Sequence, residues 1–492
     1  MDNRIEESMG KGTLYLMLAN VFFLISSYAI HFGLGRYFGP ETYGTYGIIL
    51  ALMTIVNQLL TTGFPQGASK YIAERSTSLN SIVRDSRRIQ LLFSVLIFAL
   101  YFGLAHVIAN LFNDATLTSY IRISAFVIPF SALFAIYSYG YLNGLKEFSK
   151  QMKALTASYV VKVVAIFVLV LLGLGVKGAI LGYLCAAGVG LLVAWKYVGP
   201  IEKDSTSFGW SRLIRFGVPA MLFSAILLLI MNIDLFAVKA IGGEDINTGL
   251  NTGYYTSANT LARVPYFIFL GLALALLPSI SRSTSSKDFH LTTRYINQSM
   301  RYMLILLVPG VLLMSATSES LISLVYSSEY IDAADSLGIL VFGLTFLTVF
   351  MVLANTIMGS GKPIVALGIA LPLVAIDIIL NIILIPRYEL VGAAWATTIT
   401  ALIGMIASAF YVYRSFQALV SVKSFIKICL ASLIIYVVAL QISLSPSFLP
   451  FIYIGLFAVY FGLLLLMKEF NKEDVETFKR IFSLASFSRR QE

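Results

Sequence analysis

The chain has 492 residues, of which 58% are hydrophobic and 12% are charged, and its formal net charge is +10. A soluble domain carries roughly twice that share of charged residues, so the composition excludes a soluble enzyme, a disordered chain and a nucleic-acid-binding domain. The two cysteines and three histidines show none of the short spacings that mark zinc sites, and both cysteines lie in apolar runs.

Apolar segments follow one another along the whole chain, each about as long as one bilayer crossing of about 20 residues. They are continuous rather than alternating, which favours membrane helices over the strands of a barrel. We expect an all-α polytopic membrane protein with about 14 transmembrane helices. The expected segments are 12–35, 43–62, 89–112, 121–143, 154–175, 178–198, 213–240, 255–280, 302–325, 336–358, 364–385, 391–413, 425–444 and 448–467.

The loop charges predict the orientation of these helices. If the N-terminus is cytoplasmic, 28 of the 35 Lys and Arg residues fall on the inner side, and Arg122, Lys162 and Arg263 lie in or at the edge of helices. Only Arg36, Lys177, Lys239 and Arg387 fall on the outer side. We therefore expect both termini in the cytoplasm and a multi-pass protein of the cytoplasmic membrane.

An internal repeat divides the chain. The sequence "NGLKEFSKQM" (143–152) is matched by "GSGKPIVALG" (359–368), and "VKGAILGYL" (176–184) by "LVGAAWATT" (390–398). Two six-helix lobes of one orientation follow from this repeat, which is a plan for alternating access. The expected domains are an N-lobe (1–200), a C-lobe (201–415), two extra helices (416–470) and a cytoplasmic amphipathic tail (471–492).

The loops on the outer side are short, and the longest covers about residues 241–254. A membrane-embedded polymerase or glycosyltransferase needs a sizeable loop that carries catalytic carboxylates. We therefore expect a protein that is not an enzyme.

Four charged residues interrupt the apolar runs, namely Lys162, Asp234, Arg263 and Asp377. A charge at the bilayer centre costs about 3 kcal/mol even on the lenient insertion scale, so it needs a role or a partner. One alternative is that these four residues form internal salt bridges between the lobes. The other is that they line a wet cavity and bind ligands.

The acidic members of this set predict a site for a coupling ion. Asp377 and Asn381 are spaced i, i+4 and face one way, and Asp234 and Thr397 could join them. Carboxylate, amide and hydroxyl oxygens are hard ligands that suit Na⁺, which would be the only cofactor or metal. A proton is the alternative, because a carboxylate in a low-dielectric site can titrate.

The basic members predict a site for an anionic substrate. Lys162, Arg263 and Arg36 would attract a phosphate or diphosphate group. Asn57 and Gln58 could bind sugar hydroxyls, although polar side chains of this kind also serve as contacts between helices.

The chain resembles the polysaccharide transporter (Wzx-type oligosaccharide flippase) family. The resemblance rests on the segment "RYFGPETYGTYG" (36–47), the helix count, the duplicated lobes and the "NGLKEF" and "VGAA" joints. That family is part of the multidrug/oligosaccharidyl-lipid/polysaccharide exporter superfamily. In the lipid II flippases of the superfamily, an aspartate on helix seven, an Asn/Asp pair on helix eleven and a threonine on helix twelve bind Na⁺. Asp234, Asp377, Asn381 and Thr397 occupy similar places, with the helix-eleven pair in reversed order.

The resemblance implies translocation of a polyprenyl- or dolichyl-phosphate- or diphosphate-linked oligosaccharide by alternating access, coupled to Na⁺ or H⁺. It implies membrane lipids and glycan-assembly enzymes as partners, no nucleic acid, and a monomer. Helix two here has no basic residue, in contrast to the lipid II flippases, which disfavours lipid II as the substrate. The alternative is a cation-coupled exporter of drugs or other small molecules from the same superfamily.

Overall fold

The computed structural model describes residues 2–74, 79–199, 208–241, 247–286, 288–418, 420–442 and 445–470. All regular secondary structure in these ranges is helical, as the continuous apolar runs predict. Ten helical stretches of the described chain are long and apolar enough to cross a membrane. The all-α membrane fold is therefore confirmed, whereas the count of fourteen stays a prediction. The expected tail (471–492) lies outside the described residues.

The chain packs into two compact units, and each is described by itself. Unit 1 comprises Met1–Thr260, Tyr326–Ala333 and Ala370–Thr397, and unit 2 comprises Leu261–Val325, Ala334–Ile369 and Thr398–Glu492. These units follow packing rather than the sequence repeat, so the lobes 1–200 and 201–415 stay predictions.

Unit 1 contains the helices of the first half of the chain and several pieces of the second half. Its elements are α1 (Asp2–Thr62), α2 (Phe64–Ala73), α3 (Leu79–Gly103), α4 (Ala105–Leu111), α5 (Leu117–Ala125), α6 (Val127–Ala135), the π-helix η1 (Ile136–Leu142), α7 (Phe148–Leu169), the π-helix η2 (Val170–Leu174), α8 (Gly175–Val198), α9 (Trp210–Ile230), α10 (Ile233–Ile241), most of α11 (Asn247–Ala262), the 3-10 helix η3 (Ser328–Ala333) and the middle of α16 (Pro363–Phe416).

Three long helical stretches contain a break in the backbone. In α1 the break is at Gly39 (φ 71°, ψ 171°), directly before Pro40. In α16 it is at Glu389 (φ 47°, ψ −125°), shortly after Pro386, and between α7 and α8 it is at Gly173 (φ 88°). A proline cannot donate a helical hydrogen bond, and glycine adopts a positive φ at little cost. The breaks at Gly39 and Glu389 fall in gaps between the segments expected from the sequence, whereas Gly173 lies near the end of the expected segment 154–175.

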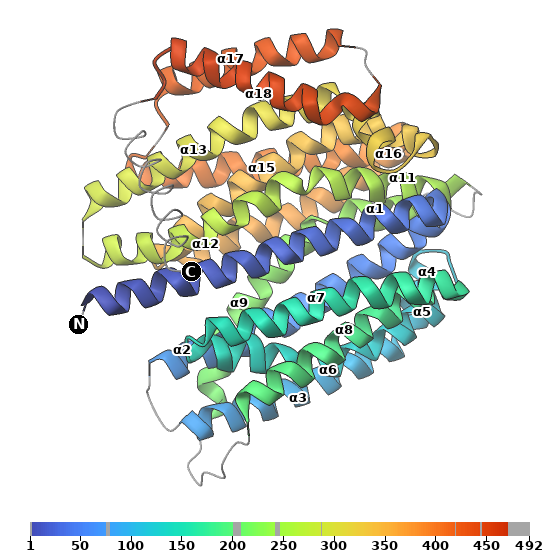
Figure 1. The fold of residues 1–492 in the computed structure, drawn as a ribbon, viewed down its shortest axis with the longest axis vertical. Coiled ribbons are helices and arrows are strands. Elements are labelled where there is room, and N and C mark those ends of the chain that lie inside the picture. Colours follow the sequence, from blue (N-terminus) through green and yellow to red (C-terminus); the bar gives the residue numbers. More distant parts are fainter. Residues whose placement is uncertain are drawn as a thin grey trace, which may run out of the picture. The chain divides into compact units, whose positions relative to one another are not determined.

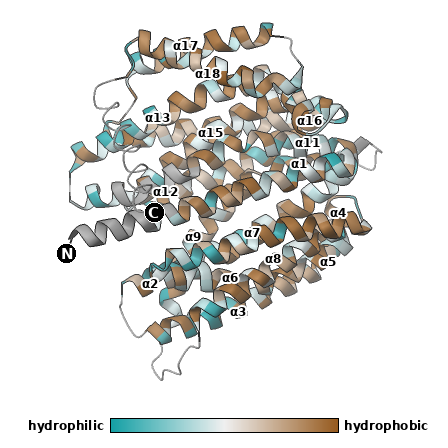
Figure 2. Cartoon of the chain, viewed as in Figure 1, coloured by the Kyte–Doolittle hydropathy of each residue, from teal (hydrophilic) through white to brown (hydrophobic). Residues whose placement is uncertain are grey.

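Close helix contacts in unit 1 rely on small residues. The helices α6, α7 and α8 run side by side (Figure 1), and hydrophobic residues cover most of their length (Figure 2). A β-carbon on Gly182 of α8 would lie 2.8 Å from the backbone nitrogen of Ile166 in α7. Such backbone contact is the usual way in which membrane helices pack tightly.

Unit 2 contains the remaining helices, including the last two. Its elements are α12 (Val264–Ser285), α13 (Phe289–Ala316), α14 (Ser318–Val325), α15 (Ala334–Gly359), both ends of α16, α17 (Val422–Gln441), the 3-10 helix η4 (Pro446–Phe448) and α18 (Leu449–Leu466).

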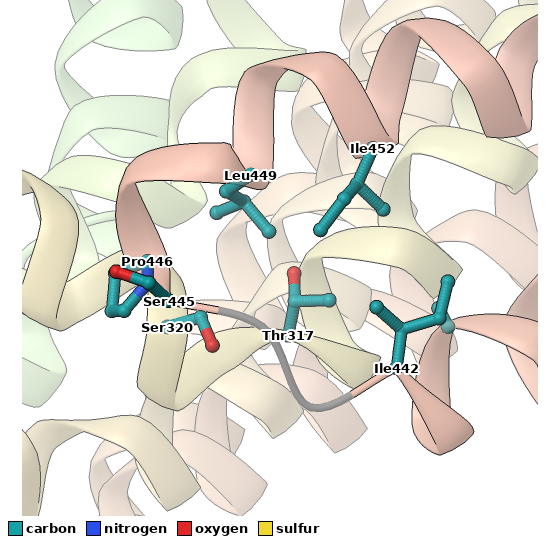
Figure 3. Close-up of a pocket in the computed structure, with 8 residues that line it drawn as sticks. Thr317, Ser320, Ile442, Ser445, Pro446, Leu449 and Ile452 are labelled. Carbon is teal, nitrogen blue, oxygen red and sulfur yellow. The ribbon is translucent and has the colours of Figure 1, made fainter.

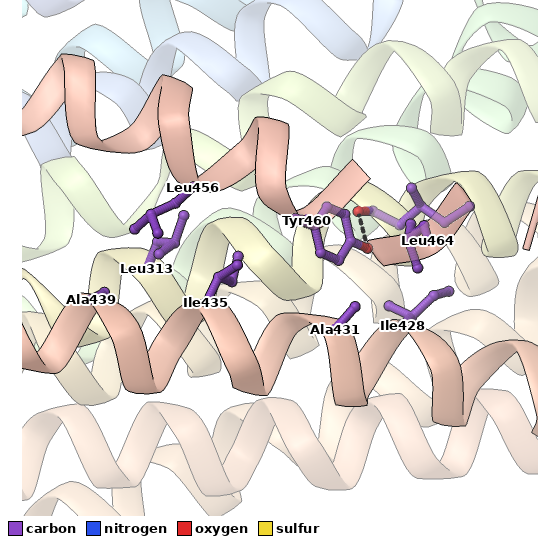
Figure 4. Close-up of a cluster of buried hydrophobic side chains, with 9 residues drawn as sticks. Leu313, Ile428, Ala431, Ile435, Ala439, Leu456, Tyr460 and Leu464 are labelled. Carbon is purple, nitrogen blue, oxygen red and sulfur yellow. Dashed lines mark hydrogen bonds between the residues drawn. The ribbon is translucent and has the colours of Figure 1, made fainter. Parts of the chain in front are cut away.

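The α17–α18 hairpin packs on α13 through a buried apolar cluster (Figure 4). Ile428 and Ile435 of α17 meet Leu456 and Tyr460 of α18 there. The Tyr460 hydroxyl donates a hydrogen bond of 2.8 Å to the carbonyl of Ile305 in α13. The phenol therefore finds an acceptor inside an otherwise apolar contact.

A small pocket lies near the other end of this hairpin (Figure 3). Thr317, Ile442, Leu449 and Ile452 contribute to its lining. It has room for about one water molecule, which is far too little for a lipid-linked substrate.

Candidate functional site

A break in the seventh expected segment positions a fully buried acidic residue, Asp234. The segment 213–240 was expected to be continuous, but α9 ends at Ile230 and α10 begins at Ile233, with Met231 and Asn232 in a turn. The Asn232 side chain donates a hydrogen bond of 2.6 Å to the carbonyl of Leu228. This bond replaces the helical hydrogen bond that the carbonyl loses at the break, where the membrane offers no water as a donor. Interrupted membrane helices commonly form ion and substrate sites in transporters.

Asp234 lies in the first turn of α10 and is completely buried. Its Oδ1 accepts a hydrogen bond of 2.7 Å from the backbone nitrogen of Leu235. Its Oδ2 accepts one of 2.7 Å from the Tyr255 hydroxyl of α11 and one of 3.0 Å from the Thr397 hydroxyl of α16. Three donors from three helices are thus arranged around one carboxylate, and Tyr255 and Thr397 are themselves fully buried.

Asp377 and Asn381 form the second part of this buried group. Both lie on α16 and are at most 1% exposed. The Asn381 amide donates to the Asp377 carbonyl at 2.9 Å and to its Oδ1 at 3.3 Å. The Asn381 Oδ1 has no hydrogen-bond partner in the part of the chain that the structure describes. Asp377 also interacts electrostatically with the Tyr255 hydroxyl, so the two parts adjoin.

We name Asp234, Tyr255, Asp377, Asn381 and Thr397 the carboxylate cluster. Its two carboxylates, the Asn381 amide and the Thr397 hydroxyl supply hard oxygen atoms of the kind that suit an alkali cation rather than a soft metal. Adjoining buried carboxylates are also groups that can bind a proton.

Lys162 is buried in the same unit, on α7, among aromatic rings. Its side chain is 8% exposed. Its Nζ lies 5.5 Å from the ring centre of Phe23, 5.3 Å from that of Tyr159 and 5.6 Å from that of Tyr183. Cation–π contacts of this kind offset part of the desolvation of an ammonium group. No carboxylate of the described chain forms an ion pair with Lys162.

The other residues expected to bind substrate have different surroundings. Arg36 and Asn57 of α1 are exposed, and Gln58 is half-buried. Arg263 is half-buried in unit 2, directly before α12, where it interacts electrostatically with the Tyr266 hydroxyl. A common cationic surface made by Arg36, Lys162 and Arg263 therefore stays a prediction.

A group of hydrogen-bonded aromatic residues in unit 1 was not expected from the sequence. The Tyr43 hydroxyl lies 2.8 Å from Nδ1 of His31 and 3.1 Å from the hydroxyl of Tyr326. The Tyr330 hydroxyl donates a hydrogen bond of 2.6 Å to the carbonyl of Gly35. These bonds join the break region of α1 to the segment 326–333 of the second half of the chain.

Comparison with known proteins agrees with this architecture. A family model described as "Polysaccharide biosynthesis protein" matches residues 34–335. An uncharacterized membrane protein of Methanocaldococcus jannaschii is 24% identical over 83% of this chain and 98% of its own length. A Shigella flexneri protein named for O-antigen transport is 23% identical over 75% of this chain and 89% of its own length. The solved structure of lipid II flippase MurJ in an inward closed conformation superposes with a TM-score of 0.75 at 18% identity, covering 93% of this chain and 99% of that one.

The helical membrane fold and these relatives define the class of protein: it is a multi-pass membrane transporter of the polysaccharide exporter superfamily. Because the family model covers more than half of the residues, the chain belongs to the polysaccharide biosynthesis protein family.

Proposed function

We propose that this transporter flips a lipid-linked oligosaccharide across the cytoplasmic membrane, with a cation at the carboxylate cluster as the driving ion. One observation carries the proposal: in the described part of unit 1, the buried ammonium of Lys162 contacts aromatic rings and forms no ion pair with a carboxylate. A buried charge costs about 3 kcal/mol in the bilayer. An anionic ligand at Lys162 would offset that cost, which supports a phosphate group as its partner.

Lys162 is the proposed contact for the phosphate or diphosphate of the substrate. The Lys162 ammonium contacts aromatic rings and, within the described chain, no carboxylate, so an anion can approach it without first displacing an acidic side chain. The further substrate contacts proposed from the sequence are Arg36, Arg263, Asn57 and Gln58. The names of the Shigella flexneri relative and of the family support a polysaccharide precursor as the substrate.

The carboxylate cluster is the proposed ion site, with Asp234, Asp377, Asn381 and Thr397 as ligands for Na⁺. The Asn381 Oδ1 supports this assignment, since it is a buried acceptor to which no described group donates. A proton on Asp377 is the alternative, because a protonated carboxyl group is itself a donor that could serve that amide oxygen.

Transport of a labelled polyprenyl-diphosphate oligosaccharide in reconstituted vesicles tests the substrate assignment. We expect Lys162→Ala to lower the rate roughly tenfold to a hundredfold, as loss of a charge-assisted contact does, and Lys162→Arg to retain more activity. Lys177→Ala removes an exposed lysine from α8 and is the matched control. Full activity of Lys162→Ala would reject the proposed phosphate contact. Drug efflux without glycan transport would instead identify a small-molecule exporter.

A further inference from the structure

The helix α11 presents two faces with different contacts. Gly249, Gly253, Thr256 and Thr260 follow one another at helical spacing and share one face. Tyr255 lies on the opposite face, two positions after Gly253. The first face contacts the part of α1 that follows the break at Gly39, and the second face contacts the carboxylate cluster.

On the first face the two helices touch through their backbones. A β-carbon on Gly253 would overlap the carbonyl of Pro40, and one on Gly44 would lie 2.6 Å from the backbone nitrogen of Gly253. A β-carbon on Gly47 would overlap the Thr256 side chain. A contact this close leaves α11 no room to move towards α1 and requires small residues on the facing surfaces.

On the second face, Tyr255 is the side chain that ties α11 to the cluster. Its hydroxyl donates to Oδ2 of Asp234, the oxygen that also accepts from Thr397. A cation that coordinates this oxygen uses the same lone pairs as the two donors. Cation binding and the Tyr255–Asp234 hydrogen bond therefore compete for one atom.

We propose that Tyr255 is a positioning residue that transmits occupancy of the ion site to the contact between α11 and α1. Without the cation, its hydrogen bond to Asp234 fixes the rotation of α11 about its axis, so that Gly253 on the opposite face stays in register with Pro40 and Gly44. When the cation takes Oδ2, the bond breaks, and α11 can rotate and leave this close contact with α1. This inference rests on the proposed function, because it requires a cation at the carboxylate cluster.

On the predicted topology, the contact lies towards the outer side of the membrane, since Arg36 and the loop before α11 are assigned to that side. The aromatic group of His31, Tyr43, Tyr326 and Tyr330 joins other segments at the same break in α1. Release of α11 would thus remove one of the contacts that hold the segments together at this break. Cation binding would in this way change access to the protein interior from the outer side of the membrane.

The experiment uses the full chain in nanodiscs, with Cys185 and Cys429 replaced and spin labels at Tyr37 of α1 and Asn251 of α11. The distance distribution is measured against NaCl, with choline chloride holding the ionic strength constant. Na⁺ binding is measured separately as the Na⁺-dependent rise in Tm. Tyr255→Phe removes only the hydroxyl, and Tyr254→Phe, the adjacent tyrosine, is the matched control.

We expect Na⁺ to lengthen the label distance in the wild type and in Tyr254→Phe. Tyr255→Phe should bind Na⁺ about 3- to 10-fold more tightly, because a competing hydrogen bond is gone, while its label distance no longer responds to Na⁺. A Tyr255→Phe protein that binds and responds as the wild type does would overturn the role of Tyr255 alone. A wild type that binds no Na⁺ would overturn the proposed ion site and this inference together.

Discussion

Gly253 of α11 and Pro40 of α1 touch through their backbones, so that a β-carbon on Gly253 would overlap the Pro40 carbonyl oxygen. Neither residue carries a functional group, yet their contact joins two helices from opposite halves of the chain. It lies two residues from Tyr255, which binds Asp234. The first prediction follows from the lack of space at this position.

Gly253→Ala should hold α11 away from α1, since the carbonyl oxygen cannot move without the helix. Overpacking of this kind costs about 1–3 kcal/mol, which corresponds to a shift of roughly 5- to 150-fold in the population of the closed contact. The measurement is maleimide labelling of a cysteine at the buried Thr256, which should become roughly tenfold faster. Gly188→Ala, on a face of α8 with no atom within 4 Å, is the control. Equal labelling of both variants would show that the contact tolerates a methyl group.

The ion pair between Asp114 and Lys239 predicts a dependence of stability on pH. The two side chains lie 2.9 Å apart, and Asp114 stands in the loop before α5. Partial burial by itself raises the pKa of Asp114, but hydrogen bonds from Thr116 and Lys239 and the charge of Lys239 outweigh it and lower the pKa overall. Folding therefore favours the charged form of Asp114. The resulting stability is present above about pH 3.9, the ordinary pKa of an aspartate. It is lost as the pH falls through the lower pKa that Asp114 has in the folded protein.

Thermal unfolding of the wild type and Asp114→Asn between pH 7 and pH 3 tests this sign. Asp114→Asn should be less stable by about 1 kcal/mol or less at pH 7, as for other partly exposed pairs. The difference should shrink towards zero at the acidic end. A gap between the two proteins that widens as the pH falls would contradict the assigned direction.

Glu469 anchors the last hairpin of unit 2. Its carboxylate accepts from Nε of Arg301 at 2.9 Å, pairs with Lys427 at 3.4 Å and accepts from the Ser424 hydroxyl. Glu469→Gln removes the buried carboxylate that Arg301, Lys427 and Ser424 share, which should cost about 3 kcal/mol. Lys427→Ala removes the more exposed partner and should cost about 1 kcal/mol or less. Chemical denaturation in detergent compares the two variants, and a larger loss for Lys427→Ala would contradict the ranking.

Thr397→Val tests whether the hydroxyl beside Asp234 contributes to cation binding. The substitution preserves shape but removes the donor at 3.0 Å and a potential oxygen ligand. We expect Na⁺ affinity to fall roughly tenfold, read from the Na⁺ dependence of Tm. Thr398→Val is the matched control, because the neighbouring hydroxyl bonds to the carbonyl of Ile339 in unit 2. Loss of Na⁺ dependence in both variants alike would indicate a general packing effect.

The sequence predicted much of the fold because membrane helices follow simple rules. Long apolar runs predicted helices, and Gly39 with Pro40 and Pro386 stand where long helices break. The break at Met231 was not predicted, because "LLLIMNIDLF" reads as one apolar run. A turn of only two residues hardly changes the mean hydropathy of a membrane-spanning segment.

The acidic residues of the candidate site were also predictable, whereas their surroundings were not. Asp234 and Asp377 stand out because a carboxylate is costly in an apolar helix. Tyr255 does not stand out, since tyrosine is common in membrane helices and only its contact with Asp234 distinguishes it. Tyr43 and Tyr326 are 283 residues apart, and no local pattern predicts their hydrogen bond.

The central claim is that a cation bound at the carboxylate cluster drives translocation of a lipid-linked glycan. The direct measurement is translocation of labelled lipid-linked oligosaccharide in proteoliposomes under an imposed Na⁺ gradient, with an H⁺ gradient in parallel. We predict that the Na⁺ gradient accelerates transport by the wild type and has no effect on Asp234→Asn or Asp377→Asn. Transport that is indifferent to the gradient in the wild type, or equally Na⁺-driven in both variants, would contradict this claim.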